Sequence, residues 1–171
     1  GASVFIRCHY AAGTGGKSIA DFAGYASPCY LAVASTFSGR IAGAAHLGEH
    51  AQEALFAEVN YQDNADLALL LDWLKGITAP EGRRVVVWDT EEMHIALEAS
   101  VAACGATPPR LCLWPLHDAL LSVGIRAGNL ERAAVVMGLP ALTEMGSWPF
   151  VVRRVMLLRQ LLQKLCVLEA T

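Results

Sequence analysis

The stretch Arg84–Trp88 (RVVVW) decides the fold class of this chain. Its three consecutive valines form a continuous β-branched run, which is typical of a central strand buried on both faces. The segment before it, Asn64–Gly76 (NADLALLLDWLKG), begins with a capping Asn, carries an apolar stripe and ends in Gly, which predicts a helix. After the run, Thr90 can cap a second helix over Glu91–Cys104. A buried strand between two helices indicates an α/β domain.

The N-terminal part of the chain is predicted to form strands. Ser3–Tyr10, Cys29–Phe37 and Arg40–Leu47 are short apolar runs bounded by Gly, Pro or Ser. Ser38-Gly39 is a turn signal, and it favours antiparallel pairing of the last two runs. The segment Ile19–Tyr25 fits a strand or a helix equally well. We therefore expect a mixed sheet flanked by helices, with antiparallel N-terminal strands and then a parallel strand.

The C-terminal part is predicted to be mainly helical. Leu111–Trp114 is a short apolar run, and Asp118–Val123 fits a helix. Asn129 can cap a short helix that ends before Pro140. Phe150–Ala170 is predicted as a long amphipathic helix that closes the chain.

The composition indicates one apolar domain. The chain has 171 residues, of which 54% are hydrophobic and 17% charged, and its mean hydropathy is +0.39. These values exclude an intrinsically disordered chain and predict that part of the surface lies against a partner. We expect a single domain over residues 1–171, with an N-terminal strand and Gly-rich loop at 1–17 and a core at 18–168.

Charge and cysteine content indicate which partners and which cellular compartment fit this chain. The net charge is −3, so nucleic acid is compatible with the chain but is not indicated by its charge. None of the five cysteines forms a C-x-x-C pair, which favours reduced thiols in an intracellular, reducing compartment. The longest apolar stretch, Phe150–Leu168, contains four basic residues, which argues against a membrane span.

A first candidate site is the loop Ala11–Ser18 (AAGTGGKS), which fits a loose phosphate-loop pattern with Ala in place of the usual first Gly. The backbone around Gly16 would cradle phosphates, Lys17 would contact the terminal phosphates and Ser18 would bind Mg²⁺. Asp89, after the buried strand, would be the second magnesium ligand. Gly24 and Ser27-Pro28 leave little room for the helix that such a loop opens. We therefore keep a nucleotide-binding domain as an alternative.

A second candidate is His46-Leu47-Gly48-Glu49-His50, which has the HxxEH order of inverted zinc peptidases. On a helix, His46 and His50 would lie on one face, where both could bind zinc. Gly48 weakens such a helix, and no downstream Glu is singled out as the third ligand. We therefore favour two surface histidines at a helix start over a zinc site.

A third pattern runs through most of the chain. It comprises Asp21-Phe22-Ala23, the pair Trp88-Asp89, His117–Leu121 (HDALL), Asn129–Pro140 with its Gly-Leu-Pro end, and the long final helix. This order resembles the DEDD 3′–5′ exonucleases of the ribonuclease-H-like fold, over roughly residues 18–168. The resemblance implies a ribonuclease-H-like mixed sheet and a setting in RNA processing. In that family an Asp-x-Glu pair, a later Asp and a final H-x-x-x-x-D motif hold two metal ions and activate water.

Carried onto this chain, the family's site is incomplete. Asp21 matches the first acid and Asp89 the third, but Ala23 stands at the second position. Trp148 stands where the general base belongs, and Arg153 where the last Asp belongs; an arginine there would repel a metal ion. The resemblance therefore predicts a catalytically inactive domain without a cofactor, kept as a protein-interaction or scaffold module. An active, Mg²⁺-dependent exonuclease is a further alternative.

The final helix is predicted to supply the contact surface of this module. Its apolar residues cover most of its circumference, so it needs cover on two sides. In so short a chain, we expect the second cover to be a protein partner or a second copy of the chain. The predicted interface residues are Phe150, Val151, Val155, Leu158 and Leu162.

Overall fold

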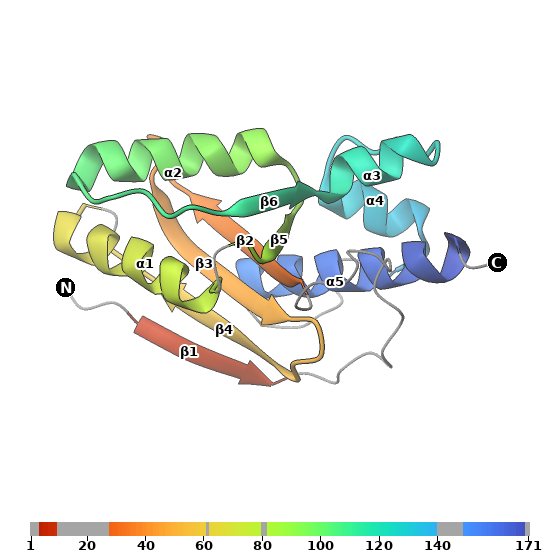
Figure 1. The fold of residues 1–171 in the computed structure, drawn as a ribbon, viewed down its shortest axis with the longest axis horizontal. Helices are drawn as coiled ribbons and strands as arrows, with labels where there is room; N and C mark the ends of the chain where they lie inside the picture. The colour runs from red at the N-terminus through yellow and green to blue at the C-terminus, as the bar shows by residue number, and fades with distance from the viewer. Residues whose placement is uncertain (1–3, 10–27, 61, 80–81, 140–148, 170–171) are drawn as a thin grey trace.

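A six-stranded mixed sheet forms the centre of the protein (Figure 1). The computed structural model describes residues 4–9, 28–60, 62–79, 82–139 and 149–169, and the side chains of 4–9 and 168–169 are not among the described atoms. The strand order is β1-β4-β3-β2-β5-β6. The strands are β1 (Val4–His9), β2 (Cys29–Ser35), β3 (Ile41–Gly48), β4 (Glu53–Glu58), β5 (Arg84–Val87) and β6 (Cys112–Pro115).

The pairing of these strands confirms the predicted fold class. β1, β4, β3 and β2 pair antiparallel in that order, whereas β2 with β5 and β5 with β6 pair parallel. The protein is therefore an α/β domain with a mixed sheet in a ribonuclease-H-like arrangement. The continuous run of three valines in β5 is buried on both faces, as the sequence predicts: Val86 faces one core cluster, and Val85 and Val87 face the other.

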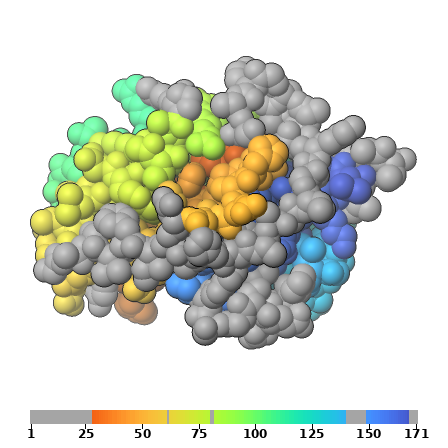
Figure 2. Space-filling model, turned by 90° about the horizontal axis from the view of Figure 1, so that it is seen from below, coloured from red at the N-terminus to blue at the C-terminus, as the bar shows by residue number. Residues whose placement is uncertain are grey.

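The helices lie on both faces of the sheet (Figure 1). On one face α1 packs beside α2, and on the other α5 lies along the strands, with α3 and α4 beside it at one end. Figure 2 shows the molecule from below, with α1 in yellow to green next to the orange segment that holds β3 and β4. The helices are α1 (Asn64–Ile77), α2 (Thr90–Cys104), α3 (Leu116–Ser122), α4 (Leu130–Val136) and α5 (Phe150–Glu169).

The helix starts differ by one residue from two of the predicted caps. Asp63, not Asn64, caps α1, because its carboxylate accepts from the backbone N–H groups of Ala65 and Asp66. Asp89, not Thr90, caps α2. The third expected cap is confirmed, since the side chain of Asn129 accepts from the backbone at the start of α4.

The predicted interface on α5 is wrong for four of its five residues. Val151, Val155, Leu158 and Leu162 are at most 3% exposed. The helix is covered on two sides, as predicted, but both covers belong to this chain: the sheet on one side, and α3 and α4 on the other. Of these five residues, only Phe150, which is 48% exposed at the start of α5, is open to a partner.

A cluster of buried polar side chains fixes α5 to the loop between β3 and β4. Arg159 in α5 donates to the carbonyl oxygens of Gly48, Glu49 and Ala51 at 2.9, 3.3 and 2.7 Å. The Glu49 carboxylate accepts from the Tyr30 hydroxyl at 2.6 Å and from the Gln163 amide at 3.2 Å. We call Tyr30, Glu49, Arg159 and Gln163 the anchor cluster. All four are at most 9% exposed, so their hydrogen bonds replace contacts with water.

Burial changes the acid–base properties of the anchor cluster. It raises the pKa of Tyr30 above its usual value, and the adjacent Glu49 carboxylate raises that pKa further. Burial also lowers the pKa of Arg159 to about 10, which leaves the guanidinium charged at neutral pH. The cluster therefore joins the sheet to α5 through a cation, a carboxylate and a phenol that keeps its proton.

The HxxEH segment does not form a helix. His46 lies in β3, and Glu49 and His50 follow in the loop, so neither the zinc-peptidase arrangement nor a pair of histidines at a helix start is present. His46 is only 8% exposed, and its Nε2 atom has no hydrogen-bond partner. Burial lowers the pKa of His46 to about 4, with the charge of Arg83 as the smaller cause. The imidazole is therefore neutral at pH 7.

The helices and the cysteines bear on the predicted compartment of the protein. In the described part of the chain, no helix is long and apolar enough to cross a membrane. Among the cysteines with described side chains, Cys29, Cys104 and Cys112 are free thiols. Burial raises the pKa of Cys29 to about 11, so this thiol keeps its proton at neutral pH.

We predict that Arg159→Met destabilises the fold by about 3 kcal/mol, because it leaves the three carbonyl groups of Gly48, Glu49 and Ala51 without their charged donor. The free energy of unfolding is measured by urea denaturation at pH 7. Arg132→Met, at an exposed position in α4, is the matched control and should cost less than about 0.5 kcal/mol. Equal losses in the two variants would show that α5 does not depend on the anchor cluster.

Candidate functional site

A small cavity lies at the carboxyl end of β5, beside the middle of the parallel strand β2. Parallel strands have their carboxyl ends at the same edge of a sheet, and functional side chains gather there in open α/β sheets. The cavity holds about 20 Å³, roughly the space of one water molecule. We call it the strand-end cavity. It is lined by Leu31, Ala32, Val33, Val87, Trp88, Asp89, Glu92, Met93, Arg154 and Leu158.

Asp89 lies in the strand-end cavity directly after β5, where the sequence places it. Its carboxylate accepts from the backbone N–H of Glu91 at 2.9 Å and so caps α2. Glu92 lies in the first turn of the same helix, where the helix dipole favours a negative charge. The Asp89 carboxylate therefore has a structural role as the cap of α2.

The strand next to β5 carries no acid on the face of the cavity. β5 pairs with β2 and β6, so under the exonuclease resemblance β2 would be the acid-bearing central strand. An Asp-x-Glu pair puts both acids on one face of a strand, because strand side chains alternate. On the face of β2 toward α5, those two positions are Ala32 and Ala34. Asp21 and Ala23, to which the sequence assigned this pair, lie outside the described residues.

A guanidinium from α5 reaches the strand-end cavity. Arg154 lines it, whereas Arg153, predicted at the position of the last acid, does not. Arg153 lies instead with its Cζ atom 5.8 Å from the centre of the Phe150 ring. The assignment of Arg153 to the position of the last acid stays a prediction. Adjacent helix positions point about 100° apart, so the docking of α5 decides which of the two arginines faces the cavity. Trp148, the predicted replacement of the general base, lies outside the described residues.

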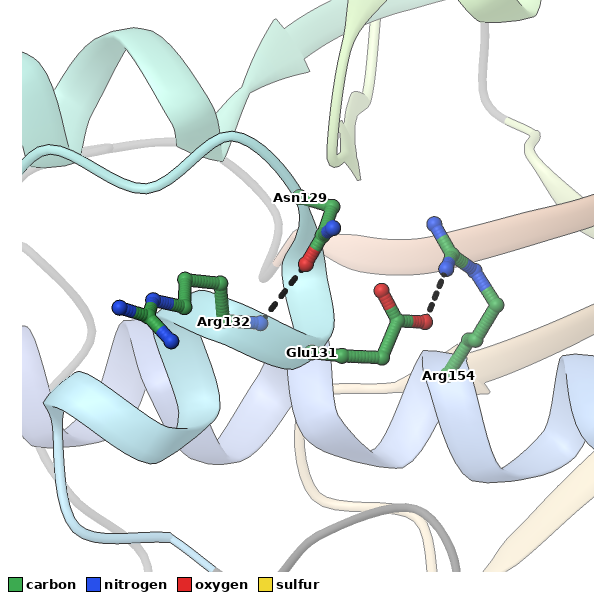
Figure 3. A network of polar contacts seen from close by, with 4 residues as sticks. All are labelled: Asn129, Glu131, Arg132 and Arg154. Carbon is green, nitrogen blue, oxygen red and sulfur yellow. Dashed lines mark hydrogen bonds and ion pairs between the residues drawn. The ribbon is translucent and has the colours of Figure 1, made fainter.

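Arg154 is paired with an acid from α4, as Figure 3 shows. Its Nη1 atom lies 2.6 Å from Oε1 of Glu131, and the two side chains are 13% and 38% exposed. Asn129 caps α4 by accepting from the backbone of Arg132 at 2.8 Å, which places Glu131 in the first turn facing α5. The Arg154 guanidinium also lies 5.4 Å from the centre of the Phe150 ring.

The segment after β6 also reaches this side of the sheet. The backbone N–H of His117 donates to the carbonyl of Trp88 at 3.1 Å, and the His117 and Trp88 rings are 5.0 Å apart between centres. The HDALL pattern therefore lies beside the residue that precedes Asp89. This contact was not foreseen from the sequence, which placed the two motifs in order but not in space.

The chemistry of the strand-end cavity follows from its charges. Two carboxylates, Asp89 and Glu92, line it together with one guanidinium, Arg154. Within the described residues, no group of three or more His, Cys, Asp or Glu side chains is placed to hold a metal ion. A resident cation beside Asp89 opposes the approach of a second, divalent cation.

The phosphate-loop residues Gly16, Lys17 and Ser18 lie outside the described residues, so the nucleotide-binding alternative stays a prediction. Comparison of the chain with models of known protein families, with curated proteins and with solved structures finds no match. The exonuclease resemblance therefore rests on the sequence pattern and on the sheet.

We predict a coupling of about 1 kcal/mol between Arg154 and Glu131, the size expected for a well-aligned pair that is partly open to water. It is measured by a double-mutant cycle of Arg154→Met and Glu131→Gln, with unfolding free energies from urea denaturation. The coupling should decrease in 1 M NaCl. Additive effects of the two substitutions would mean that the pair does not join α4 to α5.

Proposed function

We propose that this protein is a catalytically inactive exonuclease-like domain that serves as a protein-interaction module, with RNA processing as its setting. The observation that carries the proposal is the composition of the strand-end cavity. Where two-metal chemistry needs several carboxylates, the cavity has Ala32 and Arg154 around Asp89 and Glu92. The RNA-processing setting rests on the family resemblance alone.

The charge of Arg154 supports inactivity more strongly than the missing acids do. A missing carboxylate weakens a metal site, but a guanidinium in its place adds a repulsive charge. Arg154 is also held in place by Glu131 at 2.6 Å, so displacing it would leave that carboxylate without its partner. The active-exonuclease alternative requires Arg154 to leave this position.

An interaction role now needs a surface other than α5. Phe37 is fully exposed at the turn between β2 and β3, and Ile95 is 54% exposed on α2. The turn packs against α2: a Cβ atom added at Gly39 would lie 3.5 Å from the Ala99 Cβ and 4.0 Å from the Ile95 Cγ2. The turn that carries Phe37 therefore packs beside Ile95, and exposed apolar side chains on a protein surface are typical of protein contacts when they gather into a patch.

We predict that the pure protein does not shorten end-labelled single-stranded RNA or DNA with Mg²⁺ or Mn²⁺. The substitutions Ala32→Asp, Ala34→Glu and Arg154→Asp together should instead create saturable Mn²⁺ binding. Two of the new carboxylates line the cavity that holds Asp89, the third lies on the same face of β2, and the cation is removed. Calorimetry measures this binding, and circular dichroism checks the fold. The matched control adds Asp89→Asn to the triple variant and should lose the binding.

Two outcomes would contradict this prediction. Metal-dependent shortening by the unmodified protein that Asp89→Ala abolishes would establish the active-exonuclease alternative. A folded triple variant with no Mn²⁺ binding would show that the strand-end cavity does not correspond to an exonuclease metal site.

We also predict that Phe37→Asp weakens protein contacts of the domain without unfolding it, because the side chain is fully exposed. Self-association is the contact that the pure protein can show, and sedimentation velocity over a range of concentrations measures it. Val136→Asp, at a 53% exposed position in α4, is the control. Self-association that both variants weaken equally would place the contact surface elsewhere, and a monomer at all concentrations would remove the second-copy alternative.

A further inference from the structure

We propose that a groove between α2 and the turn from β2 to β3 binds a basic peptide segment of a partner protein, in which an apolar side chain lies next to lysine or arginine. The groove holds about 410 Å³, and we call it the acidic groove. It is lined by Ser35, Gly39, Asp89, Glu91, Glu92 and Ile95. The chemistry of this partner is inferred on the basis of the interaction role proposed above.

The turn from β2 to β3 holds an exposed aromatic side chain in a fixed position. Phe37 is fully exposed at this turn. Two backbone hydrogen bonds close the turn, from Gly39 to the Thr36 carbonyl at 2.9 Å and from Thr36 to the Arg40 carbonyl at 2.8 Å. Gly39 has a φ of +86°, a conformation that favours glycine. Because the backbone is already ordered, a partner that contacts Phe37 has little flexibility of the turn to restrict.

The turn packs against α2, and the groove extends from this contact to the start of the helix (Figure 1). Glu91, Ile95 and Glu98 follow one another at spacings of four and three residues, so they lie along one face of α2. All three side chains are exposed. An apolar side chain between two carboxylates fits a basic segment, because the segment's apolar group can cover Ile95 while its cations contact the carboxylates.

The charges of the acidic groove favour a cationic partner. Asp89, Glu91 and Glu92 contribute three carboxylates. Within residues 28–60 and 82–139, which contain all of the lining residues and their chain neighbours, no base lines the groove. The N-terminus of α2 carries only about half a positive charge, so the carboxylates outweigh it. The same carboxylates repel nucleic-acid backbones and anionic lipids, which favours a basic protein segment as the partner.

Two of the acids on this surface are open to a partner. The Asp89 carboxylate caps α2, and Asp89 and Glu92 also line the strand-end cavity together with Arg154. The side chains of Glu91 and Glu98, by contrast, are exposed and form no hydrogen bond or ion pair within the described part of the chain. A cation of the partner can therefore pair with them without breaking an existing contact. Exposed ion pairs contribute little affinity by themselves, so the apolar contact supplies the affinity and the carboxylates select the partner.

The experiment selects short peptides from a random phage-displayed library on the whole chain, and calorimetry measures synthetic copies of the recovered peptides. We expect sequences rich in Lys and Arg around an apolar residue, with dissociation constants in the micromolar range. Phe37→Ser should weaken binding about tenfold, because it removes the exposed apolar contact. The double variant Glu91→Gln, Glu98→Gln should weaken it by a similar factor, and 1 M NaCl should weaken it as well.

Two variants are matched controls. Asp72→Asn with Asp118→Asn neutralises two exposed acids that do not line the acidic groove. Val136→Ser changes an apolar side chain that is 53% exposed in α4. Both controls should bind the peptides as the unmodified chain does, and circular dichroism checks that every variant is folded.

Three outcomes would overturn the proposal. The first is a selection that yields no peptide with saturable binding, or only peptides that lack Lys and Arg. The second is an equal loss of binding in the control variants. The third is self-association of the pure protein that Phe37→Ser abolishes and that excludes the peptide, which would make a second copy the occupant. Metal-dependent shortening of RNA by the same protein would contradict the proposed inactivity and leave peptide binding unchanged, so the two failures are distinguishable.

Discussion

The structure depends on one buried cation, Arg159 in α5. This helix lies against an apolar face of the sheet, yet the loop between β3 and β4 brings three backbone carbonyl groups to that same face. A buried carbonyl without a donor is costly, and Arg159 supplies the donors. Glu49, bound by Tyr30 and Gln163, places a carboxylate in the same cluster. Because a helix is rigid over this length, the anchor also determines which residue of the first turns of α5 reaches the strand-end cavity.

The sequence predicted the sheet better than it predicted the surroundings of α5. The three-valine run in β5 can be buried on both faces only in a covered central strand, so its pattern has one reading. The apolar residues around α5 allow two interpretations, since the second face of the helix can pack against other helices of the same chain or against another chain. The choice depends on where α3 and α4 pack, and residues 116–136 do not encode that placement in their local periodicity. For the same reason Asp63 and Asn64 could not be distinguished as caps, because both side chains are good caps.

The candidate site was predictable only where a charged residue follows a recognisable strand. Asp89 satisfies that condition, because it comes directly after the valine run. Ala32 and Ala34 do not, because alanines on a buried strand are ordinary core residues and give no sign that acids are absent. Arg154 could not be separated from Arg153 without the docking of α5. A search for small residues at positions i and i+2 of the strand paired with β5 would have found the two alanines.

The pairing of Arg154 with Glu131 has an evolutionary consequence. Replacing Arg154 alone by an acid would bring a new carboxylate near Glu131 and Asp89 at once, and like charges in a partly buried site repel. Introducing an acid at Ala32 first would bury a carboxylate in a cavity with little room for water. Each single step toward a metal site is therefore destabilising by itself. A lineage that carries this ion pair can keep changing its surface, while the acquisition of metal chemistry in this cavity requires several coordinated substitutions.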